Sequence, residues 1–148
     1  MEGIRWDVAP MLQADRNGKL SILLVDDEPF IRSLLADALM YQGYQVYEAE
    51  DGATGLEQFC AIQPDLVLLD ILMPGLNGLA VLQEIRRQNP VVGILVVSAL
   101  SSKQVTLEAM AAGADGYIRK PFDLRELFRK IESLDRRVCF RSTELHPV

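Results

Sequence analysis

The fold of this chain is decided by residues 65–78, which read Asp65-Leu66-Val67-Leu68-Leu69-Asp70-Ile71-Leu72-Met73-Pro74-Gly75-Leu76-Asn77-Gly78. Leu66 to Leu69 form an unbroken apolar run, which is typical of a strand buried on both faces in a parallel sheet. The run ends at the carboxylate of Asp70, and Pro74-Gly75 delays the next helix. Open α/β sheets bind ligands at the carboxyl ends of their strands, so Asp70 is a candidate site residue. A single Asp at this place is equally compatible with a turn cap.

Four more apolar segments are also predicted to be strands, and a helical pattern follows each of them. The predicted strands lie at 21–25, 44–49, 66–69, 91–97 and 116–119, and the predicted helices at about 29–42, 52–63, 78–88, 102–112 and from 123 to 135 or beyond. Strict alternation of strands and helices requires right-handed crossovers and a parallel sheet covered on both sides. We therefore predict an α/β fold.

The spacing of apolar residues predicts which helix faces are buried. The inner face of the first helix is predicted as Phe30, Ile31, Leu34, Leu35, Ala38 and Leu39. The last helix begins after Asp123, a good N-cap, and its stripe is predicted as Leu124, Leu127, Phe128, Ile131 and Leu134. Cys60 follows Leu56 and Phe59 on a helical face, and it has no CxxC partner, so we expect a small buried hydrophobe.

The composition is that of an ordinary globular domain. The chain has 148 residues, 49% hydrophobic and 24% charged, with a formal net charge of -6, which argues against direct contact with nucleic acid. The longest apolar run, Val91 to Val97, is far too short to span a membrane, and residues 1–20 hold no signal-peptide core. We expect a cytoplasmic protein with an N-terminal extension at 1–19, one folded domain at 20–136 and a C-terminal tail at 137–148.

Polar residues stand at the ends of four predicted strands. Asp26 and Asp27 end the first strand, Asp70 the third, Ser98 the fourth and Lys120 the fifth. These ends share one edge of a parallel sheet, so the side chains converge. Three converging carboxylates repel one another unless a cation intervenes, and Mg²⁺ prefers such oxygen ligands. A hydroxyl and an ammonium beside the ion suit a tetrahedral anion, so the set fits phosphoryl transfer with Asp70 as nucleophile.

At these residues the sequence resembles the receiver domain of two-component response regulators. The matching segments are Val25-Asp26-Asp27-Glu28, Asp70-Ile71-Leu72-Met73-Pro74-Gly75 with Gly78, Ser98-Ala99, and Gly113-Ala114-Asp115-Gly116-Tyr117-Ile118-Arg119-Lys120-Pro121-Phe122. Together they extend over roughly 20–135. The resemblance implies a flavodoxin-like, doubly wound sheet of order 2-1-3-4-5, flanked by five helices.

The resemblance also implies the chemistry of the acidic residues. Asp70 is expected to accept a phosphoryl group from the phosphohistidine of a histidine kinase or a phosphotransfer protein. Mg²⁺ is expected to be held by Asp26, Asp27, Asp70 and the backbone carbonyl of Leu72. Such a protein phosphorylates and dephosphorylates itself, so we expect a phosphoacceptor rather than a turnover enzyme.

The remaining motif residues are implied to form a switch. Ser98 and Lys120 are expected to bind phosphoryl oxygens, and Tyr117 to turn inward on activation together with Ser98. A new dianion at Asp70 attracts the hydroxyl and the ammonium, and the loops move with them. The family also implies a cis Lys120-Pro121 bond, which base rates alone would make rare, at about 5%.

We expect the output to be a contact with a downstream protein, made by the helix at 102–112, the strand at 116–119 and the helix from 123. The same face is a candidate homodimer surface, with charge pairs among Glu108, Asp115, Arg119, Arg125 and Arg129. No DNA-binding segment follows the last predicted helix, so the expectation is a stand-alone or isolated receiver with no nucleic-acid or membrane partner.

Three other functions fit parts of the pattern. A phosphatase of the haloacid dehalogenase type needs a second Asp two residues after the nucleophile, where this chain has Leu72. A flavin-binding domain of the same fold needs a Ser/Thr-rich loop after the first strand, where Asp26-Asp27-Glu28 would repel the flavin phosphate. The third alternative is a pseudo-receiver that never takes phosphate and acts as an interaction module; retention of all five site positions argues against it.

Overall fold

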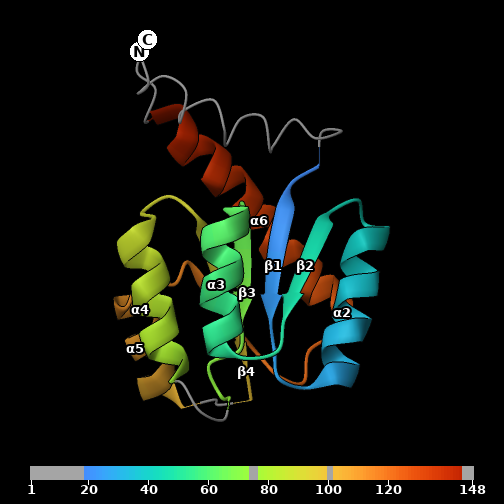
Figure 1. The fold of residues 1–148 in the computed structure, drawn as a ribbon, viewed down its shortest axis with the longest axis horizontal. Helices are drawn as coiled ribbons and strands as arrows, with labels where there is room; N and C mark the ends of the chain where they lie inside the picture. Colours follow the sequence, from blue (N-terminus) through green and yellow to red (C-terminus); the bar gives the residue numbers. More distant parts are fainter. Residues whose placement is uncertain (1–18, 74–76, 100–101, 145–148) are drawn as a thin grey trace.

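The computed structural model of the chain describes residues 19–73, 77–99 and 102–144, with side chains up to Asp135. Within this range five parallel strands lie between two layers of helices (Figure 1). The elements are β1 Ser21–Val25, α2 Pro29–Tyr41, β2 Gln45–Ala49, α3 Gly52–Ile62, β3 Leu66–Leu69, α4 Gly78–Gln88, β4 Gly93–Ser98, α5 Lys103–Ala111, β5 Gly116–Arg119 and α6 Leu124–Glu144. The predicted extension before Lys19, the break at Pro74-Gly75 and residues 145–148 lie outside the described residues.

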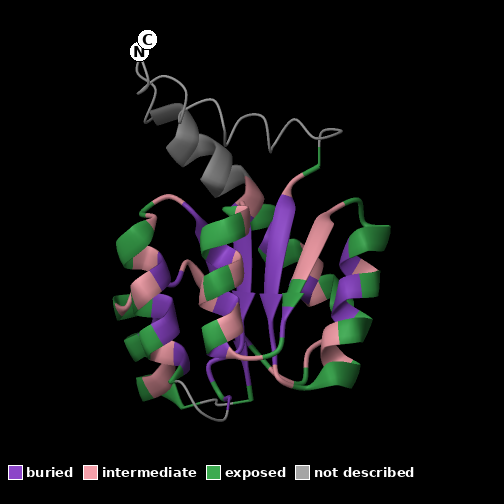
Figure 2. Cartoon of the chain, viewed as in Figure 1, coloured by how far each residue is buried: buried purple, intermediate pink, exposed green. Residues whose placement is uncertain are grey.

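The strand order is β2-β1-β3-β4-β5, and every neighbouring pair is parallel, which confirms the predicted α/β fold and its order 2-1-3-4-5. The three central strands β1, β3 and β4 are buried along their whole length, as Figure 2 shows for β1 and β3. Continuous apolar runs predicted these strands because both faces of such a sheet are covered by helices. None of the described helices is long and apolar enough to cross a membrane.

Alternate residues of each central strand supply two separate cores. Leu23, Val25, Val67 and Leu69 pack with α3, α4 and α5, through residues such as Phe59 and Val81. Ile22, Leu24, Leu66 and Leu68 pack with α2 and α6, through residues such as Leu39 and Ile131. This division follows from the period of two in strand side chains. The two cores leave only the ends of the strands free to carry polar chemistry.

Two strand boundaries differ from prediction for local reasons. β4 begins at Gly93, because the side chain of Asn89 accepts hydrogen bonds from the backbone N–H groups of Val91 and Val92 at 2.8 and 2.9 Å. Tyr44 lies before β2, because its N–H donates to Leu39 O at 3.1 Å at the end of α2. The last helix, predicted to run to Asp135 or beyond, continues to Glu144, so it includes part of the range 137–148 that was expected to be a tail.

Three predictions of burial are wrong, one of them that of Leu124 at the start of α6, which is 37% exposed. Phe30 and Leu34 are 77% and 48% exposed, whereas Leu35 and Leu39 are buried as predicted, together with Ala36. The predicted face spanned a full half of the helix circumference, since Phe30 and Leu39 are separated by 180° at 100° per residue, and the sheet covers only part of it. Cys60 is exposed on α3, where its thiol lies 3.3 Å from Gln88 Oε1, and Phe59 alone fills the core at this turn.

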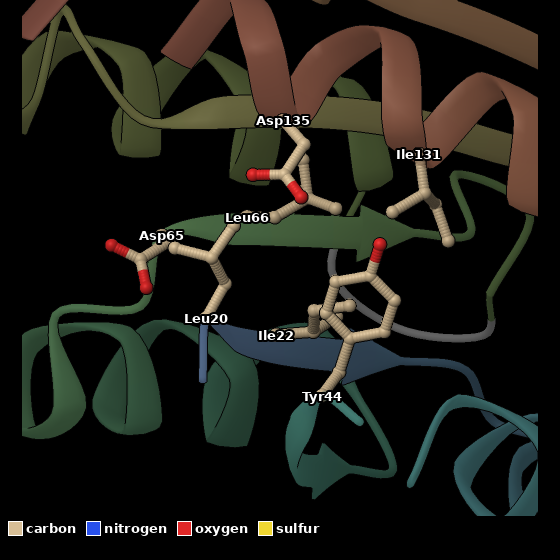
Figure 3. A pocket seen from close by; sticks show the side chains of 7 residues that line it. All are labelled: Leu20, Ile22, Tyr44, Asp65, Leu66, Ile131 and Asp135. Atoms are coloured by element: carbon tan, nitrogen blue, oxygen red, sulfur yellow. The ribbon is translucent and has the colours of Figure 1, made fainter. Parts of the chain in front are cut away.

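The amino-terminal edge of the sheet carries a second group of acids, far from the strand ends that bear the motif. Asp65 accepts hydrogen bonds from Ser21 N at 2.8 Å and Ser21 Oγ at 3.2 Å. A small cavity of about 10 Å³, room for one water at most, lies between Asp65, Tyr44 and Asp135 of α6 (Figure 3). Burial and then the charges of Asp65 and Glu132 raise the pKa of Asp135, and burial raises the pKa of Asp65.

These shifts predict a stability that depends on pH. A carboxyl whose pKa is raised in the folded state favours folding while it is protonated, and that contribution is lost as the pH rises through the raised pKa. At pH 7 the charged Asp135 therefore opposes folding, and we expect Asp135→Asn to raise the melting temperature by about 1–3 °C. The gain should vanish below the ordinary pKa of an aspartate, where both side chains are neutral. Glu57→Gln, at an exposed site on α3, is the control in thermal melts from pH 3 to 8. A gain that is the same at every pH would contradict this account.

Candidate phosphoacceptor pocket

The carboxyl edge of the sheet positions its polar residues through the backbone ladder. Asp26 N donates to Ala49 O, the last residue of β2, at 3.1 Å, and Asp70 N donates to Val25 O, the last residue of β1, at 3.0 Å. Lys120 N donates to Ser98 O, the last residue of β4, at 2.8 Å. Each polar residue is therefore fixed by the end of a neighbouring strand, which is why positions far apart in the sequence meet.

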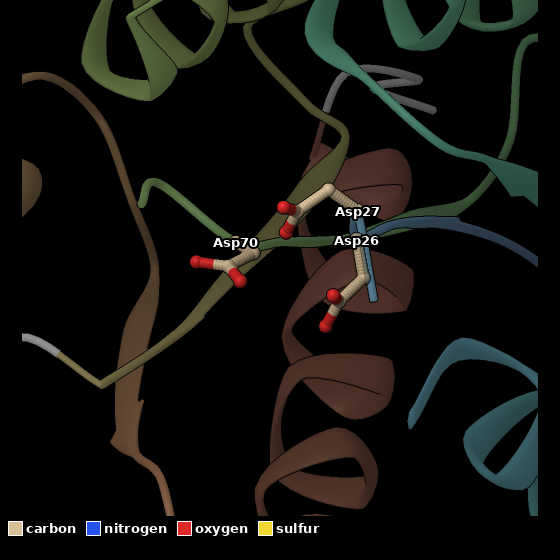
Figure 4. A group of neighbouring side chains, drawn as sticks. All are labelled: Asp26, Asp27 and Asp70. Carbon is tan, nitrogen blue, oxygen red and sulfur yellow. The ribbon is translucent and has the colours of Figure 1, made fainter. Parts of the chain in front are cut away.

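The three acids predicted to hold a metal ion do come together. Carboxylate oxygens of Asp26, Asp27 and Asp70 lie within 4.8 Å of one another, at the ends of the adjacent strands β1 and β3 (Figure 4). Asp26 and Asp70 are only 2% and 5% exposed. Each accepts a backbone hydrogen bond from the residue two positions later, Glu28 N to Asp26 at 2.9 Å and Leu72 N to Asp70 at 2.8 Å. These turns hold the carboxylates toward the common pocket.

Lys120 lies inside the same pocket. Its Nζ contacts Asp26 Oδ2 at 2.9 Å, Asp70 Oδ2 at 3.1 Å and Glu28 Oε1 at 3.3 Å. Burial by itself would lower the pKa of Lys120, but the hydrogen bond to Asp26 and the charges of Asp70 and Asp26 outweigh it and raise the pKa. The residue is thus held as an ammonium beside the carboxylate of Asp70, in a position to meet an incoming anion.

Asp70 is a buried carboxylate with a raised pKa. Burial is the largest cause, and the charge of Asp26 adds to it, while the hydrogen bond from Leu72 N and the charge of Lys120 act in the opposite direction. Burial of a carboxylate disfavours its charged form, which is the form that acts as a nucleophile. A divalent cation beside it would favour ionisation, because a bound ion is the largest charge in such a site.

Ser98 and Tyr117 occupy the side of the pocket toward β4 and β5. Ser98 is fully buried at the end of β4, and Tyr117 is half-buried on β5. Burial raises the pKa of the Tyr117 phenol, while hydrogen bonding with the side chains of Ser98 and Thr106 lowers it. The predicted switch residues are therefore neighbours in space. The Lys120-Pro121 bond is cis, as the resemblance implied.

The residues present fit a hard divalent cation. Within the described part of the chain four carboxylates, those of Asp26, Asp27, Glu28 and Asp70, face the single ammonium of Lys120 across this pocket. Within the described part of the chain, the Asp27 carboxylate makes no hydrogen bond and no ion pair. An oxygen-only donor set with excess negative charge is the chemistry that Mg²⁺ selects. Leu72 adjoins Asp70 through its N–H, and the role of its carbonyl as a ligand stays a prediction.

The sequence motifs did not assign two residues that complete the pocket. Glu28 contacts Lys120, and Arg32, one turn later in α2, donates from a guanidinium N–H to Asp26 O at 2.7 Å. Arg32 also contacts Glu48 of β2 at 3.2 Å, so it braces the turn that carries Asp26. The acidic run Asp26-Asp27-Glu28 was visible in the sequence. Glu28 and Lys120 are 92 residues apart, however, and no sequence pattern predicted that their side chains form an ion pair.

The predicted dimer surface needs one correction. Asp115 cannot pair across that surface, because its side chain is 6% exposed, contacts Arg86 at 2.9 Å and accepts a hydrogen bond from Ile94 N at 3.0 Å. It instead joins α4 to the base of β4 and β5. Glu108, Arg119, Arg125 and Arg129 are exposed, so they remain candidates for contacts with a partner.

Comparison with known families gives a match over most of the chain. Residues 22–132 match the family model described as "Response regulator receiver domain". Among curated proteins, the probable transcriptional regulatory protein TcrX of Mycobacterium tuberculosis is 33% identical over 118 residues, which are 80% of this chain and 50% of that protein. The DNA-binding dual master transcriptional regulator RpaA of Synechocystis is 36% identical over 118 residues, which are 78% of this chain and 49% of that protein. The chain thus spans about half the length of these relatives.

Solved structures agree with the fold. A CheY-like response regulator receiver domain protein from Methanospirillum hungatei has a TM-score of 0.77 and 32% identity, with 80% of this chain and 96% of that one covered. The response regulator protein TrrA from Thermotoga maritima, solved in complex with Mg²⁺ and BeF, has a TM-score of 0.72 and 42% identity, with 78% and 98% covered. Both proteins are matched over nearly their whole length, so the similarity extends to the complete fold.

Proposed function

The chain belongs to the family of response regulator receiver domains, and on that premise we propose that Asp70 is the phosphoacceptor of a two-component system, dependent on Mg²⁺. The observation that carries the proposal is the pocket itself, in which the Asp70 carboxylate lies beside two further carboxylates and contacts the ammonium of Lys120. The similar protein TrrA was solved in complex with Mg²⁺ and BeF, and this similarity supports the proposed dependence on Mg²⁺.

The reaction is a transfer between two covalent carriers. A carboxylate oxygen of Asp70 attacks the phosphorus of a phosphohistidine; the P–N bond breaks, a P–O bond forms, and the imidazole leaves with its electron pair. Asp26 and Asp27, with Asp70, would hold Mg²⁺, which supplies charge neutralisation between the acidic pocket and the incoming phosphoryl group. Catalysis of this kind is mostly positioning, so few groups are needed.

The chain's own residues then respond to the new charge. Lys120, already 3.1 Å from Asp70 Oδ2, neutralises a phosphoryl oxygen. Ser98 donates its hydroxyl to another, and its neighbour Tyr117, whose phenol hydrogen-bonds with the side chains of Ser98 and of Thr106 in α5, moves with it. The result is a changed surface on α5, β5 and α6, to which a downstream protein binds differently in the phosphorylated and unphosphorylated states. The similar proteins TcrX and RpaA are named as transcriptional regulators. We therefore propose that the downstream partner acts in the control of transcription.

Intact-mass spectrometry tests the proposal. After incubation with acetyl phosphate, the protein should gain one phosphate in the presence of Mg²⁺ and almost none when EDTA removes the ion. The Asp70→Asn variant should gain none under either condition. Absence of any gain in the wild type would favour the alternative, a pseudo-receiver that acts as an interaction module without phosphorylation.

A further inference from the structure

Arg32 makes contacts beside the pocket that the proposed transfer reaction does not explain. It lies near the start of α2, and its side chain is only 17% exposed. Its guanidinium donates through Nη1 to Asp26 O at 2.7 Å and through Nε to the carboxylate of Glu48 in β2 at 3.2 Å. Arg32 therefore links α2 and β2 to the turn that follows β1.

The carbonyl that Arg32 binds belongs to the peptide group between Asp26 and Asp27. A peptide group is planar, so its carbonyl and the N–H of the next residue turn together. The peptide group before Asp26 is also held, because Asp26 N donates to Ala49 O at 3.1 Å. With both peptide groups held, the direction in which Asp27 leaves the turn is set.

Asp27 depends on this backbone placement more than the other two acids of the cluster do. The carboxylates of Asp26 and Asp70 accept backbone hydrogen bonds and contact Lys120. Within the residues that the structure describes, the Asp27 carboxylate has no such contact, although it lies within 4.8 Å of the other two (Figure 4). Its position therefore follows from its backbone.

The charge of Arg32 cannot help a metal ion to bind. A guanidinium stays protonated in proteins, and it repels a divalent cation in the pocket beside it. If Arg32 acted only through its charge, its removal would strengthen the binding of Mg²⁺. If it positions a ligand, its removal weakens that binding. The sign of the change in affinity therefore separates the two roles.

We propose that Arg32 is a positioning residue that orients Asp27 as a ligand for Mg²⁺, through its hydrogen bond to the carbonyl of Asp26. The inference deepens the proposed function and rests on its dependence on Mg²⁺. It gives α2 and β2 a part in the metal site: through Arg32 they preorganise the carboxylate that has no hydrogen bond of its own among the described residues.

The test measures the affinity for Mg²⁺ from amide NMR shifts in variants of the full chain. Arg32→Met keeps a long, unbranched side chain at this mostly buried place and removes the charge and the donors. Arg87→Met is the matched control, because it makes the same change of charge at a 71% exposed side chain of α4, on the other face of the sheet. A third protein combines Arg32→Met with Asp27→Asn.

We expect Arg32→Met to bind Mg²⁺ about three- to tenfold more weakly than the wild type. Loss of a group that supports a metal ligand typically costs 10–100-fold, and removal of the positive charge offsets part of that loss here. Arg87→Met should bind Mg²⁺ as the wild type does. In the Asp27→Asn background, Arg32→Met should cause no further loss, because the ligand that Arg32 positions is gone.

A second measurement needs no metal ion. In EDTA, the backbone amide order parameter of Asp27 should fall in Arg32→Met from the range of rigid backbone, about 0.85, toward that of flexible backbone, below about 0.6. The amides of Ile22 and Leu24 in β1 should keep their values, which would exclude a general loss of structure.

Equal or tighter binding of Mg²⁺ by Arg32→Met would overturn the inference. A loss of the same size in the Asp27→Asn background would also overturn it, since Arg32 would then act on the pocket as a whole, and so would an unchanged order parameter of Asp27 in EDTA. Failure of the proposed function is a separate result, because then the wild type itself would bind no Mg²⁺ and take up no phosphate.

Discussion

The Asp27→Asn variant is expected to bind Mg²⁺ at least tenfold more weakly than the wild type, while its metal-free fold becomes more stable. Loss of a group that only supports a metal ligand typically costs 10–100-fold in affinity, and a direct charged ligand should cost no less. The same substitution removes one of three carboxylates that lie within 4.8 Å of one another. Repulsion between unit charges about 4 Å apart in water is about 1 kcal/mol, so a comparable gain in unfolding free energy is expected.

Asp27 is the informative position because its two neighbours in the pocket are tied to the fold. Asp26 and Asp70 both contact Lys120 and both accept backbone hydrogen bonds, so their replacement would mix metal binding with structure. Calorimetric titration with Mg²⁺ and thermal melts in EDTA measure the two effects, with Asp37→Asn on the exposed face of α2 as the charge control. Wild-type Mg²⁺ affinity in Asp27→Asn would exclude this cluster as the metal site.

Gly78→Ala is expected to destabilise the fold by about 1–3 kcal/mol or more and to impair phosphate uptake. A Cβ at Gly78 would lie 2.6 Å from Ile71 O and 2.8 Å from Ile71 C, and it would also meet Ile71 Cα. These are backbone atoms, so relief requires movement of the segment between Asp70 and Leu72, and overpacking of this kind costs about 1–3 kcal/mol or more. The same movement would disturb the hydrogen bond from Leu72 N that orients Asp70.

Gly116→Ala is the matched control. A Cβ there would meet one atom, Leu95 Cδ1, at 3.2 Å, and that end of a flexible side chain can move. Urea denaturation should place this variant close to the wild type and Gly78→Ala far below it. Equal stability of the two variants would contradict the conclusion that Gly78 is required for the close approach of α4 to the segment between Asp70 and Leu72.

The sequence predicted the sheet and the site because both depend on the same pattern. Continuous apolar runs marked β1, β3 and β4, and the polar residues that end these runs had to meet at one edge of a parallel sheet. The burial of the α2 face was predicted less well, since Phe30 and Leu34 are as apolar as Leu35 and Leu39. Residue type alone does not state on which side of a helix the sheet lies.

Contacts made by long side chains escaped prediction altogether. The pairing of Glu28 with Lys120 and the contact of Arg86 with Asp115 depend on rotamers and on the separation of loops, which no spacing in the sequence encodes. Asp115 illustrates the consequence: it was a candidate for charge pairs across a dimer surface, yet its carboxylate accepts a hydrogen bond from Arg86 of α4 within the same chain.

The most direct test of the account is the chemical location of the phosphate. Protein treated with acetyl phosphate and Mg²⁺ is reduced with borohydride, which converts an aspartyl phosphate to homoserine, and is then digested and sequenced by tandem mass spectrometry. The account predicts homoserine at position 70 alone. Phosphate on another residue, or an unmodified Asp70 in a protein that has gained mass, would contradict it.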